Sequence, residues 1–263
     1  MGSYEYLSVQ TDKHIATVTL NRPESCNAVH YDLLAELEQC VLGFRDDTDT
    51  RVVILTGAGR HFCAGADLKE LSRKKDESLI LRRRRVRIGE RVMRAIMGID
   101  QITVCAWNGA AAGGGGCLAM ATDFRIGSED CFIFYPEIDL GLNLMWQSLP
   151  RLVRLVGESR ALRLAAGGER VSADTLLNWG LLEEIVPNAD LIDRTLEFAQ
   201  TYVRKAPIAV QMIKRSVNAI GSHLDQAFMH MDADQHLLVA QSHDHKLAVD
   251  AYLEKREAKF TGN

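Results

Sequence analysis

A run of four consecutive glycines, Gly113 to Gly116, constrains this chain more than any other segment. The apolar stretch from Ile102 to Ala106 precedes it, and Leu118 to Ala121 follows it. This order predicts a strand, a glycine turn and then a helix. Glycines at such a junction leave backbone N–H groups uncovered at a helix N-terminus, where the helix dipole favours negative charge. The run therefore predicts a site for an anion formed during a reaction, such as an enolate oxygen, although close backbone packing would also explain it.

The segments around this run alternate between strand and helix patterns. Strands are expected at residues 6–9, 15–20, 51–57, 123–127, 131–134 and 181–186, and helices at 31–45, 159–166 and 173–179. Three further helices are expected from residue 190 onward, with a break at Ala206-Pro207. The pattern predicts an α/β core at residues 1–190 and a C-terminal helical oligomerisation region at residues 191–263.

Composition excludes several function classes. The 263 residues carry a formal net charge of -4 with 47% hydrophobic and 25% charged residues, so neither nucleic acid nor a membrane surface is expected as a partner. The six cysteines form no CxxC pair and have no zinc-ligand spacing, so we expect reduced thiols and no metal. Neither a signal peptide nor a membrane span is expected from the sequence, which predicts a cytoplasmic protein.

Two nucleotide-binding motifs are absent, and one basic segment is ambiguous. GxGxxG does not follow the first strand, and GxxxxGK[ST] does not occur, so neither a dinucleotide site nor a P-loop is supported. The run from Arg82 to Arg85 would suit phosphate binding. Apolar residues around it, including Ile80, Val86 and Val92, favour the solvated face of a helix instead.

Four segments, in this order, resemble the crotonase superfamily of enoyl-CoA hydratases and isomerases. They are Leu20–Pro23, Phe62–Lys69, Asn108–Gly116 and Phe134–Ile138, and weaker matches extend the resemblance over nearly the whole chain. The resemblance implies a crotonase-like spiral of ββα units followed by a C-terminal α-helical trimerisation region. It also implies a homotrimer or a dimer of trimers that binds acyl-CoA thioesters. No cofactor is implied other than the coenzyme A that the substrate carries.

The resemblance also assigns roles to individual residues. The backbone N–H groups of Ala66 and Gly114 would form an oxyanion hole for the thioester oxygen, and small residues at both turns would let the carbonyl approach the main chain. Contacts to the coenzyme A portion would come from Arg22, Ala28, Ala64, Asp67, Leu68, Lys255 and Phe260, the last two from the C-terminal region of the same or a neighbouring subunit.

One departure from the family pattern decides the expected chemistry. Hydratases of this family use two glutamates; their positions fall on Cys117 and Glu137 here, so one carboxylate is missing. A thiol accepts hydrogen bonds from water poorly, so hydration should be weak. A single base, Glu137, would suffice for 3,2-enoyl-CoA isomerisation, and its apolar neighbours suggest the burial that suits a general base.

Several alternatives stay open at this point. The chain would also fit a hydratase that positions water in an unusual way, another enolate reaction such as decarboxylation, or a catalytically weak acyl-CoA-binding protein. Cys117 is expected to be an inert thiol in an apolar site, with a nucleophilic role as the less favoured reading. Met145 and Trp146 would either reshape the acyl pocket or simply pack in the core.

Overall fold

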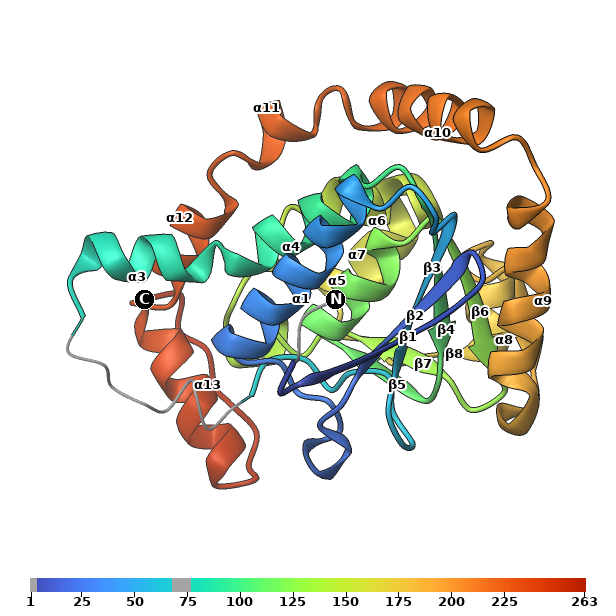
Figure 1. Cartoon of the computed structure of the whole chain (residues 1–263). Coiled ribbons are helices and arrows are strands. Elements are labelled where there is room, and N and C mark those ends of the chain that lie inside the picture. Colours follow the sequence, from blue (N-terminus) through green and yellow to red (C-terminus); the bar gives the residue numbers. More distant parts are fainter. Residues whose placement is uncertain (1–3, 68–76) are drawn as a thin grey trace.

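The computed structural model describes residues 4–67 and 77–263, and Leu68, predicted to contact coenzyme A, lies outside these ranges. Six strands form the main sheet in the order β1-β2-β3-β4-β6-β9 (Figure 1). Their bounds are Leu7–Asp12 (β1), Ile15–Leu20 (β2), Val52–Gly57 (β3), Ile102–Trp107 (β4), Phe124–Ser128 (β6) and Glu184–Val186 (β9). The first pair is antiparallel and the remaining neighbours are parallel.

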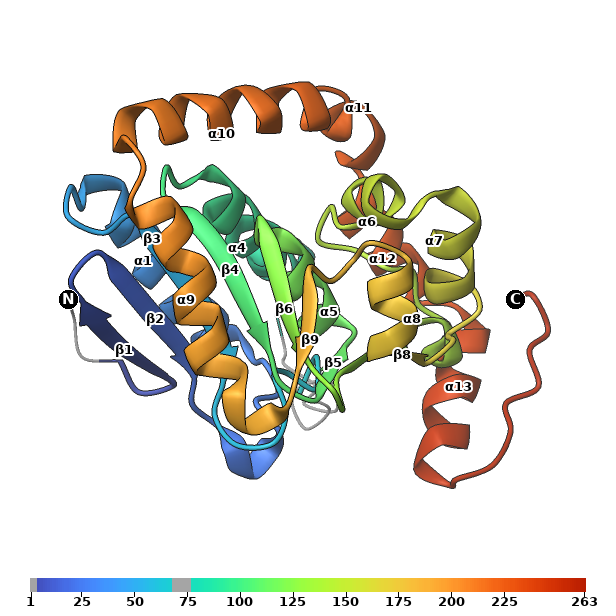
Figure 2. The ribbon, with the colours of Figure 1, turned by 90° about the vertical axis from the view of Figure 1, so that its right-hand side faces the viewer.

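The central strands are apolar on both sides because helices cover both faces of the sheet. Every residue of β3 and β4 is buried. On one face pack α1 (Tyr31–Gly43), α4 (Ile88–Gly98) and α5 (Gly114–Ala121), with Leu33, Leu37, Val92 and Leu118 in one buried cluster. On the other face α9 (Leu191–Val203) packs on Ile54, Val104 and Ile126 (Figure 2). The predicted boundary after residue 190 thus coincides with the start of a helix that packs on the core sheet.

A second, three-stranded sheet lies beside the first and carries the glycine run. It consists of β5 (Ala110–Ala112), β7 (Phe132–Phe134) and β8 (Val171–Ser172). The strand pairs β4–β5 and β6–β7 each place one strand in either sheet, and α5 follows the first pair, as expected for ββα units. The predicted glycine turn is shorter than expected. Ala110–Ala112 pair with β7, and Gly114 already begins α5, so Gly113 alone forms the turn, with φ of +48°.

From residue 190 onward the described chain forms five α-helices, where the sequence predicted three. Within the described residues, α9 is followed by α10 (Pro207–Ser222), α11 (Asp225–Met229), α12 (Asp232–Val239) and α13 (His243–Leu253). The prediction was wrong because the breaks after α10 carry no proline or glycine between Leu224 and Ser242. The start of α13 is fixed instead by the Ser242 side chain, which accepts a hydrogen bond from the backbone N–H of His245.

Shorter helices complete the fold. They are α3 (Leu79–Val86), α6 (Leu149–Val156), α7 (Glu158–Ala165), α8 (Ala173–Asn178) and the 3-10 turn η3 (Ile138–Leu140). In α3 the arginines are solvated as predicted, and Arg83 pairs with Asp234 and Arg85 with Glu77. The predicted apolar side of this helix is not buried, because Ile80 is 60% exposed and α3 has no buried residue. A bilayer-crossing helix, which needs both sufficient length and an apolar sequence, does not occur in residues 4–67 and 77–263.

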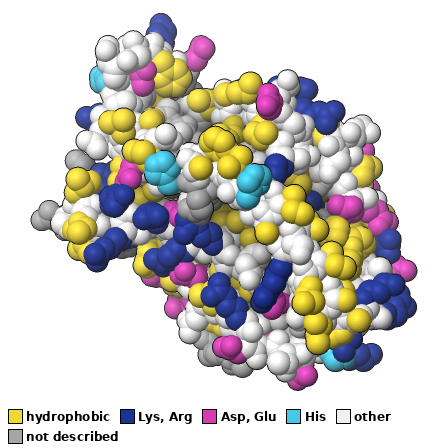
Figure 3. Space-filling model, turned by 90° about the horizontal axis from the view of Figure 1, so that it is seen from above, with side chains coloured by type: hydrophobic (Ala, Val, Ile, Leu, Met, Phe, Trp, Pro, Cys, Tyr) yellow, Lys and Arg dark blue, Asp and Glu magenta, His cyan; other side chains and the backbone are white. Residues whose placement is uncertain are grey.

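Helix α10 crosses one end of the molecule (Figures 1 and 2). Its inner face is tied down by the buried Lys214, whose Nζ lies 2.8 Å from Asp123 Oδ2 and donates to the Gln101 carbonyl at 2.6 Å. Its outer face presents five side chains that are 61–76% exposed, namely Ile208, Met212, Ile213, Val217 and Ile220. Figure 3 views this side and shows hydrophobic side chains lying between lysine and arginine groups. An exposed apolar stripe of this kind marks an interaction surface.

Candidate active site

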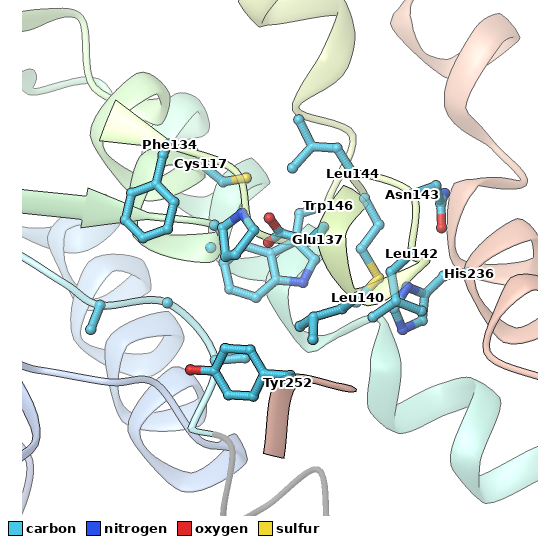
Figure 4. Close-up of a pocket in the computed structure, with 17 residues that line it drawn as sticks. Cys117, Phe134, Glu137, Leu140, Leu142, Asn143, Leu144, Trp146, His236 and Tyr252 are labelled. Atoms are coloured by element: carbon cyan, nitrogen blue, oxygen red, sulfur yellow. The ribbon is translucent and has the colours of Figure 1, made fainter. Parts of the chain in front are cut away.

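A cavity of about 240 Å³ opens between the small sheet, the start of α5 and the C-terminal helices (Figure 4). Most of its walls are apolar, which is usual for a pocket that binds a small organic molecule. The predicted residues Ala64, Ala66, Gly114, Cys117, Glu137, Met145 and Trp146 all line it. The structure therefore brings segments from four separate parts of the sequence to one place.

The two turns that carry Ala66 and Gly114 are locked together by backbone contacts. Cys63 pairs with β5, since its N–H donates to the Ala110 carbonyl at 3.0 Å and its carbonyl accepts from Ala112 N at 2.9 Å. Gly65, with φ of +84°, is packed so closely that a Cβ there would lie 2.6 Å from Ala112 O and 3.6 Å from Gly114 N. Glycine is required at this position because a side chain would push the two turns apart.

This arrangement leaves two neighbouring amides available to a ligand. Gly114 is the first residue of α5, so its N–H has no acceptor within the helix. The adjacent amides are occupied, because Asp67 N donates to Val29 O at 2.9 Å and Gly113 N donates to Phe134 O at 3.0 Å. Among the described residues, neither Ala66 N nor Gly114 N donates to a backbone acceptor. Two such donors can stabilise a negatively charged oxygen.

Glu137 lies beside these amides, just after β7 and Pro136. Its carboxyl group packs against Gly113, where any Cβ would collide with Glu137 Oε1. Its Oε2 is buried and has no hydrogen-bond partner in the described part of the chain. Burial raises the pKa of this carboxyl from 4.5 to about 7. A carboxyl group with that pKa can both accept and return a proton near neutral pH.

Cys117 lies one turn into α5, on the wall of the same pocket. It is 1% exposed, and burial, with the nearby charge of Glu137 as a smaller cause, raises the pKa of the thiol well above its usual range. The thiol is therefore protonated at neutral pH and is not a nucleophilic thiolate. Apart from Glu137, no aspartate or glutamate among residues 4–67 and 77–263 lines the pocket.

Trp146 forms a wall of the pocket and packs on the glycine run. Its indole is sandwiched between α4 and α5, where a Cβ at either Gly89 or Gly114 would overlap the ring. Trp146 and Gln147 both have positive φ values, +69° and +56°, which are uncommon for residues with side chains. The Gln147 N–H donates to Asp232 Oδ2 at 2.6 Å, so α12 holds this turn in place.

The loop that ends at Trp146 is also tied to α4. Gln147 Nε2 donates to Glu90 Oε1 at 3.0 Å, and Glu90 pairs with Arg87 at 3.1 Å. No sequence pattern connects Gly89, Glu90 and Asp232 with the pocket, because their partners are distant in the chain. Met145, predicted beside Trp146, is half-buried and lines the pocket.

The residues expected to contact coenzyme A fall into two groups. Ala64 lines the pocket. Arg22, Ala28 and Asp67 do not line it, but they contact one another, since the Arg22 guanidinium donates to the Ala28 carbonyl at 2.5 Å and to Asp67 Oδ2 at 3.1 Å. The Arg22 side chain is only 18% exposed. These contacts hold the turn around Arg22 against the segment that contains Ala66, so Arg22 and Asp67 have at least a structural role.

Lys255 and Phe260 form the second group of residues expected to contact coenzyme A. Both are exposed, Phe260 to 52%, and neither lines the pocket of its own chain. The structure therefore does not bring them together with Glu137, and a contact with a ligand would have to come from another part of the pocket mouth or from a second subunit.

Three pocket residues with hydrogen-bonding side chains were not predicted as site residues from the sequence. They are Asn143, in the loop after η3, His236 of α12 and Tyr252 of α13. A histidine or tyrosine in a polar helical region gives no pattern that connects it to a catalytic core. In the described part of the chain, no group of three or more His, Cys, Asp or Glu side chains is arranged to hold a metal ion.

Comparison with known proteins supplies a family. The sequence profile of enoyl-CoA hydratase/isomerase matches residues 10–263. Crotonyl-CoA hydratase of Syntrophomonas wolfei is 32% identical over 260 residues, covering 98% of each chain. The 1,2-epoxyphenylacetyl-CoA isomerase of Escherichia coli is 30% identical over 263 residues, covering 98% of this chain and 99% of its own. The crystal structure of an enoyl-CoA hydratase/isomerase from Pseudoalteromonas atlantica superposes with a TM-score of 0.87 at 26% identity, covering 98% of this chain and all of its own.

Proposed function

Because the chain belongs to the enoyl-CoA hydratase/isomerase family, we propose that it is a 3,2-enoyl-CoA isomerase in which Glu137 is the single base. One observation carries this proposal: Glu137 is the only described carboxylate on the pocket wall. The position that the family resemblance assigns to a second glutamate is here the buried thiol of Cys117. A reaction that needs one proton carrier fits this site better than one that needs two.

The proposed reaction has two proton transfers. Glu137 takes a proton from the 2-carbon of a 3-enoyl-CoA, and the electrons move onto the thioester oxygen as an enolate. The N–H groups of Ala66 and Gly114 donate to that oxygen. Glu137 then returns its proton at the 4-carbon, the double bond forms between carbons 2 and 3, and the thioester carbonyl is restored. A pKa of about 7 at Glu137 suits both transfers near neutral pH.

Hydration is the second candidate. The relative from Syntrophomonas wolfei is named a hydratase, and that name motivates the comparison. Addition of water across a double bond requires a group that binds and orients the water. A protonated, buried Cys117 is a poor acceptor for this task. Decarboxylation and acyl-CoA binding without turnover would use the same two amides, so they are tested alongside.

The deciding experiment is a turnover screen of 3-enoyl-CoA and 2-enoyl-CoA thioesters with product identification by mass spectrometry. The proposal expects 2-enoyl-CoA from the first set and little 3-hydroxyacyl-CoA from the second. Rapid hydration of crotonyl-CoA by the unmodified protein would refute the role given to Cys117. If the protein binds acyl-CoA but does not exchange α-protons with deuterated water, it is a binding protein and not an enzyme. Glu137→Gln serves as the matched control that removes the base.

We propose further that coenzyme A enters only as part of the substrate, with no separate cofactor, and that the protein is a homotrimer or a dimer of trimers in the cytoplasm. The apolar outer face of α10 supports association between copies, since five large apolar side chains there are exposed in the single chain. In such an assembly, Lys255 and Phe260 would be available to a neighbouring subunit's substrate.

A further inference from the structure

One end of the pocket carries polar side chains that take no part in the proposed proton transfers. Asn143 and His236 both line this end, on the side of the pocket away from Phe134, and Leu142 lies beside His236 (Figure 4). They come from different elements, the loop after η3 and helix α12. The nearby walls are apolar, because Leu140, Leu142 and Met145 also line this region.

Each of these two side chains has a buried polar atom without a partner in the described part of the chain. The atoms are Asn143 Oδ1 and His236 Nδ1. The orientation of the Asn143 amide follows from its other end, since Nδ2 donates to the Asp232 carbonyl at 3.4 Å. The neighbouring His245 differs from His236, because its Nδ1 contacts the Leu140 carbonyl oxygen at 2.7 Å. Unpartnered buried polar atoms destabilise a fold, so two of them on one pocket wall need an explanation.

The charge of this end limits what it can bind. Burial, with the nearby His245 and Arg82 as smaller causes, lowers the pKa of His236 from 6.5 to about 4. The imidazole is therefore neutral at neutral pH, with one nitrogen as donor and the other as acceptor. Asn143 Oδ1 accepts hydrogen bonds only. A ligand group that satisfies both must donate one hydrogen bond to Asn143 Oδ1 and either donate to or accept from His236 Nδ1, and the uncharged site provides no cation to attract an anion.

We propose that this end of the pocket binds a hydroxyl group on the acyl chain of the thioester, remote from the carbons that react. A hydroxyl donates one hydrogen bond, to Asn143 Oδ1, and its lone pairs accept one from the Nδ1–H tautomer of His236. A carboxylate has no hydrogen to offer Asn143, and a plain alkyl chain leaves both atoms unpaired. The inference names the substrate class of the proposed acyl-CoA site and so rests on that function.

A binding experiment tests the inference without requiring turnover. Saturated straight-chain acyl-CoA thioesters of increasing length are each compared with their ω-hydroxy analogues by isothermal titration calorimetry. At the chain length that reaches His236, we expect the hydroxylated thioester to bind about tenfold more tightly, because it makes hydrogen bonds that the alkyl chain cannot. His236→Leu should remove this preference while the plain thioester binds as before. His230→Leu, which changes an exposed histidine outside the pocket, is the matched control and should retain it.

The outcomes separate this inference from the proposed reaction. Equal binding of hydroxylated and plain thioesters at every length would overturn the inference even if isomerase activity is found. A preference for carboxylate-terminated thioesters would overturn the neutral-hydroxyl assignment. A hydroxyl preference in a protein without isomerase activity would leave the inference intact and refute only the reaction. Asn143→Leu provides a second variant and should reduce the same preference if His236→Leu fails to fold.

Discussion

Replacing Glu137 with glutamine should change the pH dependence of stability as well as activity. In the folded protein the buried carboxyl has a pKa of about 7, against an ordinary value of 4.5. The folded state therefore holds this proton more strongly than the unfolded state. Stability contributed by the protonated form is present below pH 4.5 and is lost as the pH rises toward about 7. Glutamine is neutral at every pH and shows no such loss.

The magnitude follows from the difference between the two pKa values. Each pKa unit corresponds to about 1.4 kcal/mol, so the full difference corresponds to about 3 kcal/mol in the free energy of unfolding. The free energy of unfolding of Glu137→Gln minus that of the wild-type protein should therefore rise by about this amount from acidic to mildly alkaline pH. Most of the gain should appear across the interval from 4.5 to 7.

Denaturant unfolding of both proteins over this pH range measures the effect. The protein concentration must be fixed, because association between copies also contributes to stability. Other titrating groups contribute equally to both proteins and cancel in the comparison. In parallel, kcat/KM of the wild-type protein for 3-enoyl-CoA should rise with pH to a plateau above about 7, as the base becomes ionised. Parallel stability curves for the two proteins would show that Glu137 is not a buried base.

Three other variants test separate parts of the structure. Cys117→Glu supplies a second carboxylate and should raise the rate of crotonyl-CoA hydration by about 100-fold. Cys117→Gln is its neutral control. Equal hydration rates in the two variants would contradict the role given to this position. Gly89→Ala should lower the free energy of unfolding by about 1–3 kcal/mol because its methyl group meets Trp146, and adding Trp146→Leu should recover part of the loss in thermal unfolding. Ile213→Asp with Ile220→Asp should reduce the molar mass measured by light scattering, because both change the exposed face of α10; an unchanged mass would show that this face is not an interface.

The sequence predicted the layers of the fold well because local patterns specify them. Continuous apolar runs such as Val52–Gly57 and Ile102–Trp107 became the buried central strands. Family resemblance gave the overall arrangement, which the matching crystal structure and the family profile confirm. The helix breaks after residue 222 were not predictable, because packing and side-chain caps such as Ser242 determine them, and no proline or glycine marks them.

The pocket likewise combines residues that sequence motifs predicted with residues that only long-range packing brings there. Motifs directed attention to Ala66, Gly114 and Glu137, and all three line one cavity. Their catalytic roles stay predictions. His236 and Asn143 were not foreseen, because their proximity depends on how α12 folds back over the loop after η3, and no local pattern records such a long-range contact.

Because His236 and Tyr252 line the same cavity as Glu137, the ribosome must synthesise nearly the entire polypeptide before the cavity has its full wall. The sheet and the two amides can assemble from earlier-translated residues. During biosynthesis, a nascent chain that stops short of residue 232 would thus lack the wall that His236 and Tyr252 form, while Glu137 is already in place.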